Sequence, residues 1–242
     1  MKWYTFHKKV YHFFYRGVER ATMLLDKLLN RNRSAGPHTE QYEWIVKQLS
    51  ATSSERAHGG YSADWWHELT EAEKDELEAK IWRKYPDDSR LAVFLPKLTH
   101  YDGLARLDRD LRNATSISTR VELADVLFRE TGEKRYLDVL RHCCSEECGN
   151  GILSGYRLVA VALQDYPADP EVEAILRDVY QGSSDGATLT TALIGILHQR
   201  GIVHDANDFA ELNVLLPKLR HLDMENPDGR MARLDQYLAT AT

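Results

Sequence analysis

The chain has 242 residues, of which 43% are hydrophobic and 28% charged, a balance typical of globular domains rather than disordered chains. No apolar run approaches the ~18–20 residues that cross a bilayer, and the N-terminus lacks the apolar core of a secretory signal. Three cysteines, two of them adjacent, make a poor disulfide framework, so we expect a reduced, cytoplasmic setting.

Charge is unevenly distributed along the chain, although the formal net charge is −6. Residues 1–34 hold eight Lys or Arg against Glu19 and Asp26, a balance of +6, which leaves −12 on the rest. The first predicted helix carries this basic charge beside an apolar, aromatic face. It could dock on the body, lie on a membrane surface through residues 1–33, or contact nucleic acid. We expect docking, and the acidic remainder of the chain, which would repel phosphate, argues against nucleic acid.

The next predicted helix covers residues 39–50 and is followed by the Gly-rich segment ATSSERAHGGYS, which we expect to be a loop. This loop divides the chain into an N-terminal part, residues 1–60, and a helical body, residues 61–242. Within the body, the sequence TEAE at Thr70 predicts a capping box, in which the Thr hydroxyl and Glu73 satisfy each other's backbone N–H groups.

The rest of the body predicts helices in close succession. They are expected over residues 118–131, 133–148, 152–165, 170–182 and 186–199. Asp169 precedes a proline and has the place of an N-cap, and glycines follow several helices, as is typical of C-caps. Few segments alternate with period two. The sequence therefore predicts an all-α fold of about ten to twelve helices, an irregular α-solenoid or a helical bundle.

Two segments of the chain are related to each other. DDSRLAVFLPKLTHYD aligns with DFAELNVLLPKLRHLD at an offset of 121, with nine of 16 positions identical. After a six-residue insertion, ARLDRDL matches ARLDQYL, so the related units cover residues 87–111 and 208–238. A proline inside each LPKL motif is expected to kink or split a helix. The repeated Arg-Leu-Asp segments, residues 106–108 and 233–235, are expected to make ion pairs that fix the two units.

A further pattern in the middle of the chain resembles a known repeat. DPEVEAILRDVYQG, followed by SDGATLTTALIGILHQRG, is similar to HEAT-like repeats, in which DPEV opens one helix and a run of Ala and Leu forms its partner. The resemblance covers roughly residues 118–201. It implies a HEAT-like solenoid of stacked helices, whose usual role is to hold a macromolecular partner.

The segment RHCCSEECGN holds every cysteine of the chain, Cys143, Cys144 and Cys148, beside His142. Zinc sites commonly pair their ligands as C-x-x-C with a second pair elsewhere, and no such pair exists here. Cys143 and Cys144 continue the apolar face of a helix, and free cysteine is often buried. We expect core or helix-end packing, with metal binding and a redox or nucleophilic role as the alternatives.

The related segments each contain a His-x-Asp pair, namely His100 with Asp102 and His221 with Asp223. Four such groups could bind a metal, or could act as acid and base if they met. Each Asp, however, precedes a new helix and has the place of a cap. We expect caps, with each His satisfying a backbone carbonyl.

The segment YSADWWHEL gives the strongest candidate for a partner-binding surface. Trp65 and Trp66 are adjacent, so they face different ways and at least one is expected to be exposed, beside Asp64 and Glu68. An exposed tryptophan is typical of binding hot spots. The alternative is that both rings wedge between helices.

The sequence contains no P-loop, dinucleotide-binding fingerprint, G-x-S-x-G or H-E-x-x-H motif, which favours a non-enzymatic protein and implies no cofactor. We expect a protein-binding module whose acidic face holds a basic partner protein, for example an immunity-type or antitoxin-like inhibitor. The alternative is an all-α enzyme or metal-binding protein that uses the His-x-Asp pairs. Nothing in the sequence specifies the oligomeric state.

Overall fold

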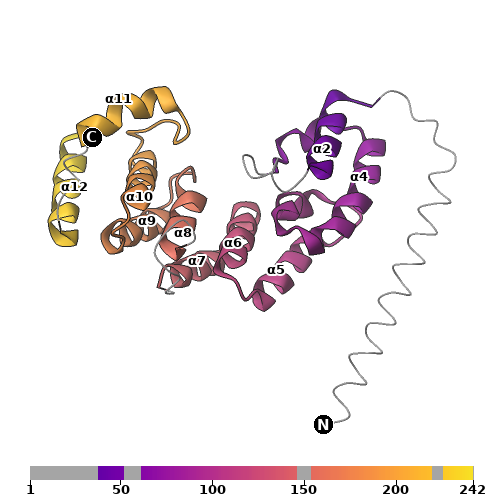
Figure 1. Ribbon diagram of the computed structural model, residues 1–242, viewed down its shortest axis with the longest axis horizontal. Helices are drawn as coiled ribbons and strands as arrows, with labels where there is room; N and C mark the ends of the chain where they lie inside the picture. Colours follow the sequence, from indigo (N-terminus) through magenta and orange to yellow (C-terminus); the bar gives the residue numbers. More distant parts are fainter. Residues whose placement is uncertain (1–37, 52–60, 146–153, 220–225, 242) are drawn as a thin grey trace, which may run out of the picture. The chain divides into compact units, whose positions relative to one another are not determined.

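The computed structural model describes residues 38–51, 61–145, 154–219 and 226–241 (Figure 1). Over these residues the chain forms ten α-helices and three 3-10 helices and no β-strand. The predicted all-α class is thereby confirmed, and the resemblance to HEAT-like repeats stays a prediction. The chain divides into two compact units, residues 1–44 and 45–242. The basic N-terminal segment 1–33 and the predicted boundary at residue 60 lie outside the described residues.

The first helices after the N-terminal segment follow the local signals in the sequence. Helix α2 (Glu40–Ser50) agrees with the prediction, and α4 (Glu71–Lys84) begins at the predicted capping box. The hydroxyl of Thr70 accepts from the Glu73 backbone N–H over 3.3 Å, and the Glu73 carboxylate accepts from the Thr70 backbone N–H over 2.9 Å. Two donors that would otherwise lack a partner at this helix end are satisfied.

The two LPKL segments adopt different helices. After η3 (Tyr85–Asp87), the first segment forms the 3-10 helix η4 (Ser89–Lys97) with Pro96 near its end. The second lies in the α-helix α11 (Phe209–Leu219) with Pro217 in its last turn. The shared sequence therefore does not impose one local structure.

Helices α5 to α10 form the larger part of the second unit and pack in a regular order. Their bounds are α5 (Gly103–Asn113), α6 (Ile117–Thr131), α7 (Arg135–Ser145), α8 (Gly155–Leu163), α9 (Pro170–Gly182) and α10 (Gly186–Gln199). Each packs against the next along the chain. In addition α6, α8 and α10 lie side by side as one row, and α7 packs beside α9 (Figure 1). This stacking of consecutive helix pairs is what a helical repeat requires.

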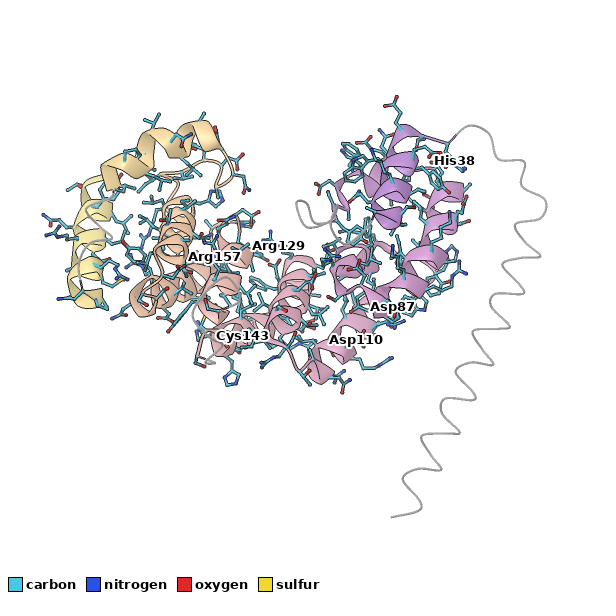
Figure 2. All side chains as sticks on the ribbon, viewed as in Figure 1. His38, Asp87, Asp110, Arg129, Cys143 and Arg157 are labelled. Carbon is cyan, nitrogen blue, oxygen red and sulfur yellow. The ribbon has the colours of Figure 1, made fainter. Side chains whose placement is uncertain are left out.

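The same kind of hydrogen bond, from an arginine side chain to a backbone carbonyl, occurs twice along the row of α6, α8 and α10. Arg129 of α6 donates to the carbonyl oxygen of Ala162 in α8 over 2.7 Å. Arg157 of α8 donates to the carbonyl oxygen of Ala187 in α10 over 2.6 Å. Both arginines lie along this row in Figure 2. Each guanidinium therefore links its own helix to the next one in the row.

Two helices begin where only glycine leaves room. A Cβ atom added to Gly103 would lie 1.9 Å from the carbonyl oxygen of Leu95, and one added to Gly155 would lie 2.0 Å from that of Cys143. Both obstacles are backbone atoms, which cannot turn away as a flexible side chain can. These glycines allow the first turns of α5 and α8 to touch the preceding helices directly.

The centre of the C-terminal half is α10, which is buried on nearly every side. Its last residue, Gln199, donates from Nε2 to the carbonyl oxygen of Tyr166 over 2.5 Å and accepts from the Asp169 N–H over 2.7 Å. From α12 (Pro227–Ala241), the buried Arg230 donates to the carbonyl oxygen of Tyr180 over 2.6 Å. A cation at this place satisfies carbonyls at the end of α9 and opposes the helix dipole.

The repeated Arg-Leu-Asp segments form ion pairs, as expected. Arg106 reaches Asp110 within its own helix, at 3.6 Å. Asp108 contacts Arg135 of α7 at 3.4 Å, and Asp235 accepts from Arg177 of α9 over 2.7 Å. The expected ion pairs are therefore confirmed for Arg106, Asp108 and Asp235. Asp108 thus links α5 to α7, and Asp235 links α12 to α9.

Candidate functional site

The adjacent tryptophans lie on η2 (Asp64–Glu68), a single short 3-10 helix. Successive residues of a 3-10 helix point about 120° apart, so the two rings cannot share an environment. Trp66 is 6% exposed and packs against Phe94 of η4, with ring centroids 5.9 Å apart. Trp65 is 43% exposed. This confirms that at least one of the two rings is exposed.

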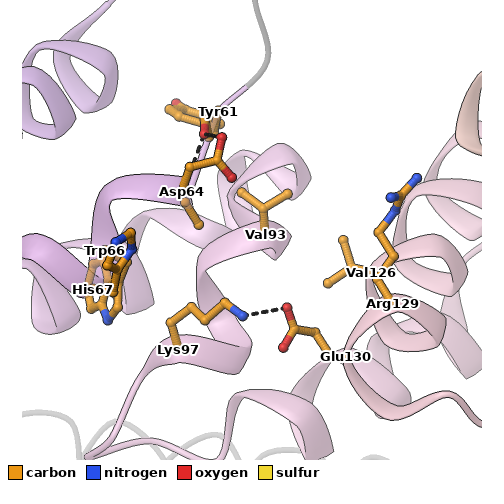
Figure 3. Close-up of a pocket in the computed structure, with 11 residues that line it drawn as sticks. Tyr61, Asp64, Trp66, His67, Val93, Lys97, Val126, Arg129 and Glu130 are labelled. Atoms are coloured by element: carbon orange, nitrogen blue, oxygen red, sulfur yellow. Dashed lines mark hydrogen bonds and ion pairs between the residues drawn. The ribbon is translucent and has the colours of Figure 1, made fainter. Parts of the chain in front are cut away.

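A pocket of about 590 Å³ lies between η2, η4 and α6 (Figure 3). Its volume is that of an ordinary ligand or side-chain pocket. Trp66, Val93 and Val126 provide its apolar walls. The remaining lining residues are mostly polar: Tyr61, Ser62, Ala63, Asp64, His67, Lys97, Arg129 and Glu130. Asp64 and Trp66, two of the residues predicted to bind a partner, line this pocket, while Trp65 and Glu68 are exposed on the same short helix.

Most charges in the pocket are already paired within the protein. Lys97 contacts Glu130 at 2.6 Å, a pair drawn as a dashed line in Figure 3. Arg129 donates to Asp125 over 2.9 Å and to Asp165 over 2.8 Å. The cations of the pocket therefore have limited capacity to hold an external anion, because each already faces a carboxylate.

Asp64 differs from the other charged lining residues. Its carboxylate accepts a hydrogen bond from the Ser62 hydroxyl over 2.6 Å. Within the described part of the chain, no Lys, Arg or His forms an ion pair with it, and the residue is exposed. A hydroxyl donor does not neutralise a carboxylate. Asp64 thus leaves the pocket with one negative charge that no cation of the described residues balances.

Further carboxylates lie on α6 and on the segments beside it, and we call these residues the acidic ridge. They are Asp88, Glu122, Asp125 and Asp165. Glu122 accepts from the Ser89 hydroxyl over 2.9 Å, and Asp88 accepts from Arg90 over 3.0 Å. Arg90 and Arg129 form ion pairs with carboxylates of the ridge. Four carboxylates against two guanidinium groups make this surface acidic.

Two carboxylates of the ridge are partly removed from water. Burial raises the pKa of Glu122, against the Ser89 hydrogen bond and the charge of Arg90. Burial also raises the pKa of Asp125 to about 6, although Arg129 lowers it and the nearby carboxylates raise it further. Such a raised pKa means that the ionised form is under-stabilised by its surroundings. A further cation at this surface would stabilise the ionised forms of these two carboxylates.

The two groups of the first His-x-Asp pair serve different purposes. Asp102 is the N-cap of α5 and accepts from the Ala105 N–H over 3.0 Å, as predicted. The Nδ1 atom of His100 lies 3.0 Å from the buried carboxylate of Glu78, which also accepts from the His100 N–H over 2.9 Å. The expectation that His100 would satisfy a backbone carbonyl is therefore wrong. His221 and Asp223 lie outside the described residues.

The cysteine segment packs as expected where it is described. Cys143 is fully buried on α7, and burial raises the pKa of Cys144 to about 12. Cys148 lies outside the described residues. Over the part of the chain with assigned structure, no group of three or more His, Cys, Asp or Glu could hold a metal ion. The packing interpretation is thus confirmed for Cys143.

Sequence reasoning missed the half of the pocket that α6 and η4 supply. Val126, Arg129 and Glu130 are three and four residues apart, so one face of α6 presents them together. That spacing was available in the sequence as a signal. Their partners Val93 and Lys97 come from η4, and no local pattern links the two elements.

Comparison with known proteins adds no relationship. No family model, no curated protein sequence and no solved structure matches this chain. Among the helices with described residues, none is long and apolar enough to span a membrane. The fold class and the pocket with its acidic ridge are therefore the basis on which its function is inferred.

Proposed function

We propose that this protein is a non-enzymatic binding module that holds a basic partner protein on the surface around η2, the pocket and the acidic ridge. The observation that carries the proposal is the exposed Trp65 beside a pocket whose surroundings have more carboxylates than cations. Exposed tryptophan supplies a large contact area, and complementary charge accelerates association and selects the partner. An immunity-type or antitoxin-like inhibitor of a basic effector is a concrete form of such a module.

The arrangement of helices supports the same proposal. Consecutive helix pairs stack from α5 to α10, and proteins built of such repeats commonly hold macromolecules. HEAT-like organisation is the corresponding proposal for the fold. The paired charges of the pocket argue against an anionic ligand, because Lys97 and Arg129 already face carboxylates of the protein.

The test is capture of a partner from native lysate, with the bound protein identified by mass spectrometry. Trp65→Ala and Glu68→Lys should each remove a partner that the unaltered chain retains, and high salt should weaken its binding. Asp87→Lys is the matched control, because Asp87 is an exposed carboxylate that does not line the pocket. Retention of the partner by both η2 variants would refute the proposal.

A further inference from the structure

The pocket between η2, η4 and α6 has a definite polarity that restricts what enters it. Val93 and Val126 face each other across the cavity, and Asp64 lies at one end of it (Figure 3). The apolar walls suit an aliphatic stem, whereas the carboxylate suits a positive group. A side chain with both parts is an arginine or a lysine, whose methylene stem packs on apolar surface while its head stays polar.

Desolvation decides between a cationic and an apolar occupant. A partner that covers this surface removes water from the Asp64 carboxylate. Burying an ionised carboxylate without a compensating charge is costly, and among the described residues the donor to Asp64 is the Ser62 hydroxyl, at 2.6 Å. An apolar anchor would leave that cost uncompensated. A guanidinium or ammonium head would compensate it directly.

The other charged residues of the pocket also favour a positively charged occupant. Lys97 and Arg129 could repel an incoming cation, but Glu130 neutralises the first at 2.6 Å and Asp125 and Asp165 neutralise the second. The uncompensated charge in the lining is therefore that of Asp64. The acidic ridge beyond Arg129 adds to the negative potential at the pocket.

We propose that the pocket binds one arginine or lysine side chain of the basic partner, with its stem between Val93 and Val126 and its charged head at Asp64. This rests on the proposed function, because it names the anchor by which a basic protein is held. It makes Asp64 the residue that selects the charge of the anchor, and it assigns Trp65 to the contact around the pocket.

The test uses three short peptides, Ac-Gly-X-Gly-NH₂, in which X is arginine, citrulline or norleucine. Citrulline keeps the shape of arginine without its charge, and norleucine keeps only an aliphatic stem. Binding to the full chain is followed by NMR, through the indole N–H signals of Trp65 and Trp66 and the methyl signals of Val93 and Val126. The variants are Asp64→Asn, whose amide oxygen can still accept from Ser62, and the control Asp87→Asn.

We expect the arginine peptide to shift these signals saturably and the two uncharged peptides to bind about tenfold more weakly, the equivalent of one charge-assisted hydrogen bond. Asp64→Asn should abolish the preference for arginine, and Asp87→Asn should preserve it. Equal binding of arginine, citrulline and norleucine would overturn the proposal. So would an unchanged preference in Asp64→Asn, or the absence of shifts at the pocket residues Trp66, Val93 and Val126.

Failure of this anchor and failure of the proposed function give different results. If Trp65→Ala and Glu68→Lys lose the captured partner while Asp64→Asn binds it with full affinity, the surface stands and the cationic anchor is refuted. If binding of the arginine peptide requires Asp64 but capture of the partner is unaffected by Trp65→Ala and Glu68→Lys, the cationic anchor is supported and the wider surface is refuted.

Discussion

Asp125 should make the stability of this protein depend on pH in a direction opposite to that of most carboxylates. Its side chain is 20% exposed, and burial raises its pKa from 3.8 to about 6 despite the contact with Arg129. The folded chain therefore holds a proton on Asp125 in a pH range where the unfolded chain has lost it. Because the folded state binds more protons there, the free energy of unfolding falls as pH rises from 3.8 to about 6.

The size of this effect follows from the two pKa values. Each unit of difference corresponds to 1.36 kcal/mol, so Asp125 contributes about 3 kcal/mol of pH-dependent destabilisation by neutral pH. Asp125→Asn removes the titration and leaves Asp165 to hold Arg129. The free energy of unfolding of this variant, relative to the unaltered chain, should therefore increase by about 3 kcal/mol between acid and neutral pH.

The measurement is urea unfolding followed by far-UV circular dichroism at a series of pH values, for the unaltered chain and for Asp125→Asn. Comparing two chains cancels the titration of carboxylates that they share. Asp138→Asn, whose side chain is 71% exposed, shows the effect of removing an exposed carboxylate. Parallel profiles for the unaltered chain and Asp125→Asn would refute the reasoning, because they would mean that Asp125 titrates alike in the folded and unfolded states.

Three further predictions test the packing. Gly103→Ala should lower the free energy of unfolding by about 3 kcal/mol, because its new methyl group meets a backbone carbonyl. Gly186→Ala should leave that free energy unchanged, because its methyl group would enter open space. The midpoints of urea unfolding of the two variants measure the difference. Arg230→Met should cost about 2 kcal/mol or more, since it leaves carbonyls at the end of α9 without their donor, and thermal unfolding at fixed pH measures the loss. In a Cys148→Ser background, Cys144 should resist iodoacetamide at pH 8 in the folded chain and react after urea unfolding. The reason is that its raised pKa of about 12 suppresses the reactive thiolate. Peptide mass spectrometry detects the labelling, and rapid labelling of the folded chain would contradict the prediction.

The sequence predicted those parts of the fold that depend on neighbours along the chain. The capping box at Thr70, the N-cap at Asp169 and the stop at Gly132, with its φ of 66°, each involve groups within four residues of one another. Such signals can be read without knowledge of the tertiary structure. Within the candidate site, the difference between Trp65 and Trp66 was predictable for the same reason.

The parts of the fold and of the candidate site that the sequence did not predict depend on contacts between residues far apart in the chain. His100 reaches Glu78, which is 22 residues away, and Lys97 reaches Glu130, which is 33 residues away. No local pattern selects these partners. The sequence therefore predicted only one side of the pocket. The tryptophans identified η2 as a candidate surface, but no sequence pattern indicated that η4 and α6 pack beside it.

The helix type of η4 shows how packing decides between two local structures. Its buried residues recur every third position, Leu91 with Phe94 and Ala92 with Leu95, and the series continues to Leu98 just beyond the helix. Three residues per turn is the repeat of a 3-10 helix, which aligns these side chains on the core. The related segment in α11 adopts an α-helix instead, and a sequence of this kind could not reveal which form would occur.

The arginine bonds that run from α6 to α8 and from α8 to α10 connect only nearest neighbours, and this has a consequence for how the protein opens. When an end helix frays, it breaks one such bond and leaves the next intact. Opening should therefore proceed helix by helix, and amide hydrogen exchange rates should differ from one helix of the row to the next. A partner seated beside Arg129 would then slow exchange first in α6, and the protection would weaken with each further helix of the row.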